Sequence, residues 1–185
     1  ERKRTEDILR GNLSAAYGET DDETTANEIM ISSQYNRTVT AKTFWSLMGS
    51  AEFNDISGID YRYTVAPGYG YYFIKEEKRL LELSGGLAYV GEKFDTGEKE
   101  DYISMFISER FDLQMKNSKL WNNLMLIPEI SDFSNFILKG EIGLESGINE
   151  RLGLRLLLKD IYDNSTQPGR DNNDIMIMSL LTYRL

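Results

Sequence analysis

Two residue types that carry much of acid–base and nucleophilic catalysis do not occur in this sequence. The 185 residues include no histidine and no cysteine. This composition excludes a Ser-His-Asp triad, a Cys-His pair, a histidine general base and a zinc site of the usual ligands. Carboxylate chemistry remains, because two paired carboxylates can hydrolyse a glycosidic bond. No carboxylate pair is singled out by its context, so we predict no catalytic residue, no cofactor and no enzymatic activity.

One acidic segment and one glycine-rich segment have compositions that can occur at ligand sites. Acidic residues cluster at Glu19, Asp21, Asp22 and Glu23, and their oxygens would suit calcium. Their spacing lacks the EF-hand pattern, so we interpret them as a solvated acidic loop. The glycines of GYGYY at 68–72 are not followed by a helical pattern and do not predict a phosphate-binding turn. We therefore predict no metal site.

Charged side chains of both signs recur at alternate positions, on a register that also holds small residues such as Gly68, Gly70, Ser84 and Ser104. Small residues and mixed charges are typical of a narrow polar lumen. The predicted members of this lumen charge network are Glu52, Arg62, Glu82, Arg110, Lys139, Glu141, Glu145, Arg151, Arg155 and Lys159.

Opposite charges inside a closed barrel must pair where water is scarce. We expect Arg110 and Arg155 to be the main cations, because a guanidinium can bind two carboxylate oxygens, and Glu82, Glu141 and Glu145 to be the main anions. Such pairing favours an occluded interior over a pore.

Ten alternating segments must position these side chains. They span Ile8–Gly18, Asn27–Arg37, Lys42–Asn54, Asp60–Phe73, Leu80–Gly91, Tyr102–Gln114, Leu120–Glu129, Phe136–Ser146, Arg151–Tyr162 and Asp174–Leu185. A period of two predicts β-strands with two different faces. Their lengths match the ~9 to 11 residues that a tilted strand needs to cross a bilayer. The sequence therefore predicts an all-β fold, a single antiparallel up-and-down transmembrane β-barrel of about ten strands.

Residues 1–185 are predicted to form one domain, with 1–7 as a periplasmic N-terminal extension. Closure is expected through pairing of Ile8–Gly18 with Asp174–Leu185, because lipid cannot solvate open sheet edges. The connections TVTA, KEEKR, MKNSK and INE are short, whereas ETDDETTA, EKFDTGEKED, SDFS and DNSTQPGRDNN are longer or more polar. All longer loops then lie at one end and both termini at the other, as is typical of outer-membrane barrels.

Aromatic residues lie near the strand ends, mostly on the register opposite to the charges. Those on the loop side are Tyr17, Phe53, Tyr61, Tyr63, Tyr89, Phe136 and Tyr162, and those on the turn side are Tyr35, Trp45, Tyr71, Phe73, Phe111 and Tyr183. Amphipathic rings favour the membrane–water interface, so we predict two interfacial belts. Between the belts lies an aliphatic band of Leu47, Val65, Leu87, Ile107, Leu126, Ile142 and Leu154. We expect Leu152, Leu154, Leu156 and Leu158 to face lipid.

The same alternation is compatible with a soluble lipid-binding barrel, whose apolar face lines the interior. A barrel of about ten strands has too small a lumen for so many large side chains, which favours the membrane interpretation. Two residues break the pattern. Glu109 falls on the lipid-facing register, and Trp121 is out of phase with Leu124 and Leu126. Local bulges are the expected cause.

Composition narrows the range of partners. The formal net charge of -9 predicts no nucleic-acid partner. The hydrophobic content is 41%, and no segment approaches the roughly 18 consecutive apolar residues of a spanning helix.

Four segments in order along the chain carry a resemblance to a known family. They are GETDDETTAN at 18–27, GIDYR at 58–62, APGYGYYF at 66–73 and LIPEI at 126–130. They resemble the corresponding parts of the YdiY-like, salt-induced outer-membrane protein family. The resemblance implies an outer-membrane β-barrel of unknown molecular role in Gram-negative bacteria, with a link to salt or acid stress.

The sequence thus predicts an integral protein of the bacterial outer membrane, a non-enzymatic structural or interaction barrel of the cell envelope. Its expected partners are outer-membrane lipid, lipopolysaccharide and other envelope proteins, and we expect a monomer. A narrow channel for ions or small solutes and a soluble lipid-binding β-barrel are the alternatives.

Overall fold

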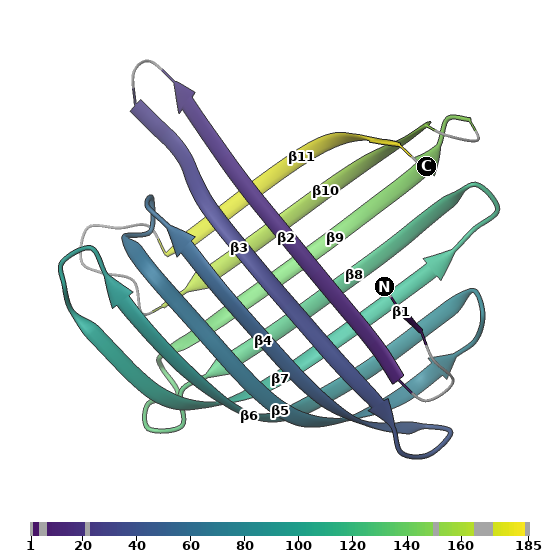
Figure 1. The fold of residues 1–185 in the computed structure, drawn as a ribbon, viewed down its shortest axis with the longest axis horizontal. Helices are drawn as coiled ribbons and strands as arrows, with labels where there is room; N and C mark the ends of the chain where they lie inside the picture. The colour runs from purple at the N-terminus through teal and green to yellow at the C-terminus, as the bar shows by residue number, and fades with distance from the viewer. Residues whose placement is uncertain (1, 4–6, 21–22, 150–151, 165–171, 184–185) are drawn as a thin grey trace.

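One antiparallel β-sheet makes up the fold (Figure 1). The computed structural model describes residues 2–3, 7–20, 23–149, 152–164 and 172–183. The strands are β1 (Arg2–Lys3), β2 (Asp7–Thr20), β3 (Glu23–Thr38), β4 (Thr43–Asn54), β5 (Ile59–Lys75), β6 (Arg79–Phe94), β7 (Lys99–Gln114), β8 (Ser118–Pro128), β9 (Phe136–Gly147), β10 (Leu152–Asp163) and β11 (Asn173–Tyr183). Each strand pairs with its neighbour in the chain, so the predicted all-β, ten-stranded meander is confirmed, with β1 as a two-residue addition that pairs with Ile8 and Leu9. Within the described ranges, no helix is long and apolar enough to cross a membrane.

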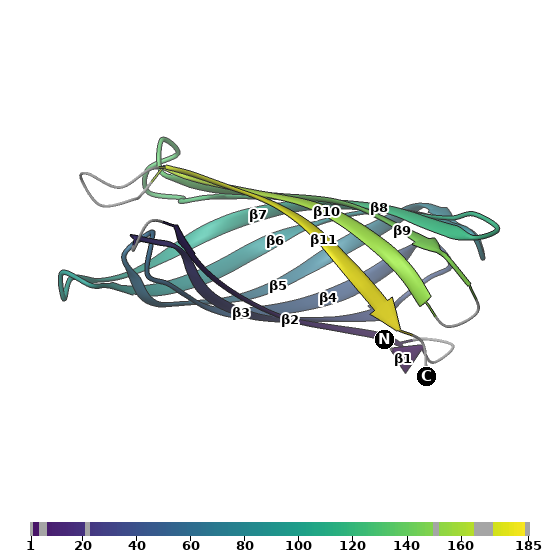
Figure 2. The same ribbon diagram turned by 90° about the horizontal axis from the view of Figure 1, so that it is seen from above.

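The sheet is curled but not closed, and the predicted closure is wrong. Among the described residues, β2 pairs with β1 and β3, and β11 pairs only with β10. Figure 2 shows the resulting half-barrel, with β2 and β3 on one side of the interior and β9 and β10 on the other. We call the interval between β2 and β11 the seam. The expected backbone pairing of β2 with β11 is absent from the described sheet. Side-chain contacts between other strands cross the interior and hold its two sides together.

Two of the polar segments predicted as long loops belong mostly to strands. The β2–β3 hairpin continues to Thr20 and Glu23, and the β6–β7 hairpin continues to Phe94 and Lys99. Backbone pairing persists through these segments, which satisfies their N–H and C=O groups whatever the polarity of the side chains. Gly97, with a φ of 87°, makes the tight β6–β7 turn.

Burial alternates along the strands and separates two faces. In β5, Thr64, Ala66 and Gly68 are buried, whereas Tyr63 and Val65 are exposed. The inward face holds a core of Ala66, Ala88, Val90, Phe106, Ile127 and Ile137. The interior is therefore not wholly polar, which corrects the expected narrow polar lumen.

Inward-facing rings explain why glycines lie opposite them. A Cβ atom on Gly70 would lie 2.1 Å from Cζ of the buried Phe44, and one on Gly68 would lie 2.5 Å from Cζ of Phe106. The phenyl rings occupy the space that side chains at these positions would need. The glycines of β5 thus serve packing inside the sheet.

Candidate functional site

The interior charges form two groups, and the more buried one is centred on Arg62. This β5 side chain is 2% exposed and contacts carboxylates from three other strands. Arg62 Nη1 lies 3.0 Å from Oε1 of Glu52 on β4, and Nε donates a hydrogen bond to Glu92 on β6. Arg62 Nη2 lies 2.6 Å from Oδ2 of Asp163 on β10. These two atoms form an ion pair, but their relative orientation does not meet the angles of a hydrogen bond. We call these four residues the Arg62 cluster.

Further contacts cross the interior beside the Arg62 cluster. Lys139 on β9 donates to Glu52 on β4 at 2.7 Å. Lys159 on β10 donates to Glu28 on β3 at 3.2 Å. Asn54 on β4 donates to Asp174 on β11 at 3.4 Å. These contacts join β3 and β4 to β9, β10 and β11, although no backbone pairing connects the first two strands to the last three in the described sheet.

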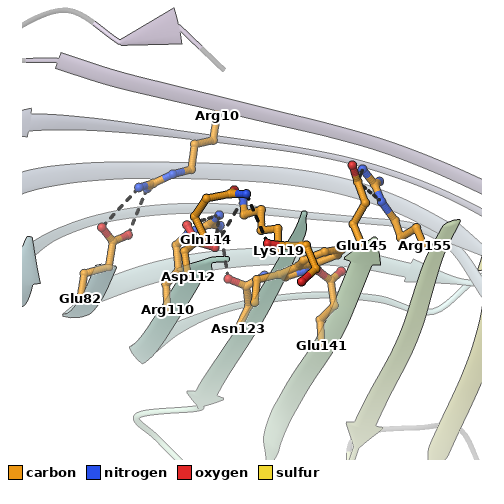
Figure 3. Close-up of polar contacts among 12 residues, drawn as sticks. Arg10, Glu82, Arg110, Asp112, Gln114, Lys119, Asn123, Glu141, Glu145 and Arg155 are labelled. Atoms are coloured by element: carbon orange, nitrogen blue, oxygen red, sulfur yellow. Dashed lines mark hydrogen bonds and ion pairs between the residues drawn. The ribbon is translucent and has the colours of Figure 1, made fainter. Parts of the chain in front are cut away.

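The second group lies toward the short turns and is drawn in Figure 3. Arg10 on β2 donates two hydrogen bonds to Glu82 on β6, at 3.0 and 3.3 Å. Arg110 on β7 donates to Asp112 on the same strand at 3.0 Å and to Asn123 on β8 at 3.3 Å. Glu82, one of the expected main anions, is thus paired with Arg10, a cation outside the predicted network.

The remaining members of this group lie on β8, β9 and β10. Arg155 donates to Glu145 at 2.7 Å, as the sequence interpretation had allowed. Glu141 instead accepts from two neutral donors, the Trp121 indole N–H at 2.7 Å and the Asn123 amide at 3.2 Å. Nine of the ten predicted lumen charges thus contact interior partners, and Arg151 lies outside the described residues.

The two pattern-breaking residues have a different cause from the one expected. Pairing of β7 with β8 keeps one register throughout, so the predicted bulges are wrong. Trp121 points inward over Gly143, where a Cβ atom would lie 2.0 Å from the indole Cζ2. Glu109 stays on the outer face and accepts a hydrogen bond from Asn122.

Several interior residues lie outside the predicted network, among them Arg10, Glu28, Glu92 and Asp163. Arg10 and Glu28 share the inward register of their strands, which could have identified them. Glu92 and Asp163 each lie one residue beyond a predicted strand end and were assigned to loops. The continuation of β6 and β10 brings both carboxylates to Arg62.

A cavity of about 770 Å³ lies inside the curled sheet. Its lining includes Arg10, Lys119, Trp121 and Arg155 on the charged side, together with methionines from several strands. A separate space of about 20 Å³ adjoins the Arg62 cluster and has room for about one water molecule. Within the described residues, no group of three His, Cys, Asp or Glu side chains is placed to hold a metal ion.

The outer face carries the predicted aromatic residues. Tyr17, Tyr35, Trp45, Tyr61, Tyr63, Tyr71, Phe73 and Tyr89 are exposed, and Phe53, Phe111, Phe136 and Tyr162 are half-buried. The side chain of Tyr183 lies outside the described side chains.

Ring contacts occur among the aromatic residues of the loop side and among those of the turn side. On the loop side the Tyr63 and Tyr89 centroids are 6.0 Å apart, and on the turn side those of Tyr71 and Phe73 are 5.0 Å apart. Between the groups, the aliphatic residues Leu47, Val65, Leu87, Ile107, Ile142, Leu154, Leu156 and Leu158 are exposed, and Leu126 and Leu152 are half-buried.

The fold and the site define the class of the molecule. It is a curled antiparallel half-barrel with an apolar outer face and charges paired inside. The chain belongs to the family described as "Protein of unknown function, DUF481", whose model matches residues 1–185. No curated protein matches the sequence significantly.

Proposed function

We propose that this protein is an integral β-barrel protein of the outer membrane of Gram-negative bacteria, with a non-enzymatic structural or interaction role. One observation carries the proposal, namely the outward exposure of a continuous aliphatic band bordered by two groups of aromatic rings. Water does not favour so large an apolar surface on a monomer, whereas lipid does. A soluble lipid-binding barrel would instead turn its leucines inward, yet Leu154 and Leu156 are exposed.

The arrangement of the connections supports an orientation. The turns after β3, β5, β7 and β9 are short and lie at one end, whereas β8 and β10 end at the other, where the longer connection 129–135 lies (Figure 1). By analogy with outer-membrane barrels, the short turns face the periplasm and the longer loops face outward. The loops would then meet lipopolysaccharide or other envelope proteins. The resemblance of four segments to YdiY-like proteins suggests that this protein has a role in the response to salt or acid stress.

Insertion into lipid tests this proposal. Protein diluted from urea into phosphatidylcholine vesicles should fold, change its migration in unboiled detergent gels, and resist protease along its strands. The same dilution without vesicles or detergent should give aggregated protein. A folded, monodisperse product in lipid-free buffer would contradict membrane residence.

The cavity of about 770 Å³ favours a second candidate, a narrow channel for ions or small solutes. The Arg62 cluster argues against it, because its side chains fill the interior between β4, β5, β6 and β10. Wild-type protein in planar bilayers should therefore pass little or no steady current. Robust, ion-selective conductance would assign the protein as a channel.

A further inference from the structure

The cavity reaches the seam between the two unpaired strand edges. Residues 11–16 of β2 line it on one side, and Met176, Met178 and Leu180 of β11 line it on the other. Leu180 occupies the inward register of β11, paired with Arg155, yet it is 39% exposed because no described strand covers it. The interior is therefore accessible from the side of the sheet as well as from its end.

The lining of the cavity next to the seam is mixed, with polar side chains such as Asn12, Ser14 and Ser32 and with an apolar part that is rich in methionine. Met30 and Met48 line it from β3 and β4, and Met176, Met178 and Leu157 line it from β11 and β10. Methionine side chains are flexible and polarisable, and they recur at binding surfaces that accept ligands of varying shape. A volume of about 770 Å³ lies within the range of small-molecule sites. An extended hydrocarbon chain fits this chemistry.

Two exposed cations lie at the short-turn side of the same cavity. Lys119 and Arg155 are 39% and 40% exposed, and their charged ends lie 5.9 and 5.5 Å from the Trp121 ring. Their carboxylate partners are Asp112, at the long distance of 3.7 Å, and Glu145, at 2.7 Å. Although Glu141 and Glu145 line the same part of the cavity, cations that keep this much exposure can bind a further, anionic head group.

On the loop side of the cavity, the Arg62 cluster and the Lys159–Glu28 pair lie across the interior and narrow the access from that end. The seam and the short-turn end remain as routes into the cavity. Unpaired backbone at membrane depth is tolerated where it lines a cavity that water can enter. The edges of β2 beyond Leu9 and of β11, which no described strand covers, border the cavity, and its lining includes polar side chains such as Asn12 and Ser14.

We propose that the cavity is a lateral binding site for a phospholipid of the surrounding membrane, one of whose acyl chains enters through the seam. The chain lies against the methionines of β3, β4 and β11, and the phosphate lies toward Lys119 and Arg155. This inference rests on the proposed membrane location and goes beyond it, because a structural barrel needs no lipid inside.

The two tryptophans of the chain provide matched reporters. Trp121 lines the cavity, in one cross-strand row with Gly143, Leu157 and Met178, whereas Trp45 is exposed on the outer face. The W45F variant leaves Trp121 as the only tryptophan, and the W121F variant leaves Trp45, so that excitation of indole alone reports one position. Each variant is reconstituted in phosphatidylcholine vesicles whose acyl chains are either brominated or unmodified, since bromine quenches indole fluorescence on contact.

Entry of a lipid chain predicts that brominated vesicles quench Trp121 strongly as well as Trp45. Adding M176Q and M178Q to the W45F variant should remove most of the Trp121 quenching, whereas M115Q, the same change in the β7–β8 turn, should leave it intact. Quenching of Trp45 without quenching of Trp121 would overturn the lipid site and leave the membrane location standing. Trp121 quenching that is unchanged by M176Q and M178Q would also overturn the site. Absence of Trp45 quenching would overturn the membrane location itself.

Discussion

The R62M substitution should destabilise the protein much more than the loss of an exposed ion pair does. Arg62 lies among three carboxylates, Glu52, Glu92 and Asp163, whose side chains are at most 8% exposed. Methionine keeps much of the apolar length of arginine, so the change removes mainly the charge. Among the described residues, Lys139 still contacts one of these carboxylates, because its Nζ lies 2.7 Å from Oε2 of Glu52. Removing one partner from a buried ion pair costs about 3–5 kcal/mol, because the other charge stays desolvated.

An exposed ion pair supplies the control. Arg79 Nη2 and Glu76 Oε2 lie 2.8 Å apart at the turn between β5 and β6, and the two side chains are 54% and 55% exposed. The R79M substitution should cost only about 0–1 kcal/mol, the value typical of surface pairs. Urea titration of both variants in phosphatidylcholine vesicles, followed by tryptophan fluorescence, gives the two free energies of unfolding.

A second change tests whether unpaired charge is the cause. In the double variant R62M/E92Q one carboxylate is neutralised, and part of the lost free energy of unfolding should return. The reasoning would be refuted if R62M and R79M differed by less than about 1 kcal/mol, or if E92Q deepened the loss caused by R62M.

Two further predictions concern the outer and inner faces of the sheet. The L154R variant should lose about 2–4 kcal/mol of unfolding free energy in vesicles, because Leu154 lies in the proposed lipid-facing band. The control I148R, in the β9–β10 turn, should lose about 0–1 kcal/mol. Equal losses in the two variants would contradict the band. The G70A variant should lose about 1–3 kcal/mol through overlap with the Phe44 ring, and F44L should restore part of it. In the control G11A the new Cβ would lie 4.0 Å from its nearest neighbouring atom, so this variant should be neutral or slightly stabilising. A neutral G70A would contradict the prediction and show that the Phe44 ring moves freely.

Sequence alone was sufficient for the strands and their faces, because both follow from local alternation. β10 shows this well: Leu154, Leu156 and Leu158 are exposed, and Arg155 and Lys159 contact interior carboxylates, as their spacing predicts. A period of two is a property of each strand by itself, so it survives any arrangement of the neighbours.

The partners across the interior could not be predicted, because they depend on the curl of the whole sheet. Arg10 and Glu82 are 72 residues apart, and Lys159 and Glu28 are 131 residues apart. Alternation tells which face a side chain occupies, but not which distant strand it meets. The open seam was missed for the same reason, since alternation in β2 and β11 carries no information about their mutual distance.

The extent of the strands was underestimated where polar residues suggested loops. Glu92 and Asp163 were lost from the predicted network in this way, although both contact Arg62. Side-chain polarity marks a solvated loop only when the backbone also lacks partners, and here antiparallel pairing continues past the predicted ends.

The most direct test of the account is a spin-label scan along β10, from residue 154 to residue 159. The chain contains no cysteine, so each introduced cysteine carries a single nitroxide at a known position. In reconstituted protein, labels at Leu154, Leu156 and Leu158 should relax readily with oxygen, which concentrates in lipid, and should be shielded from an aqueous nickel chelate. Labels at Arg155 and Lys159 should show the opposite preference, giving a period of two. Nickel accessibility at all three leucine positions would contradict the proposed membrane-spanning barrel.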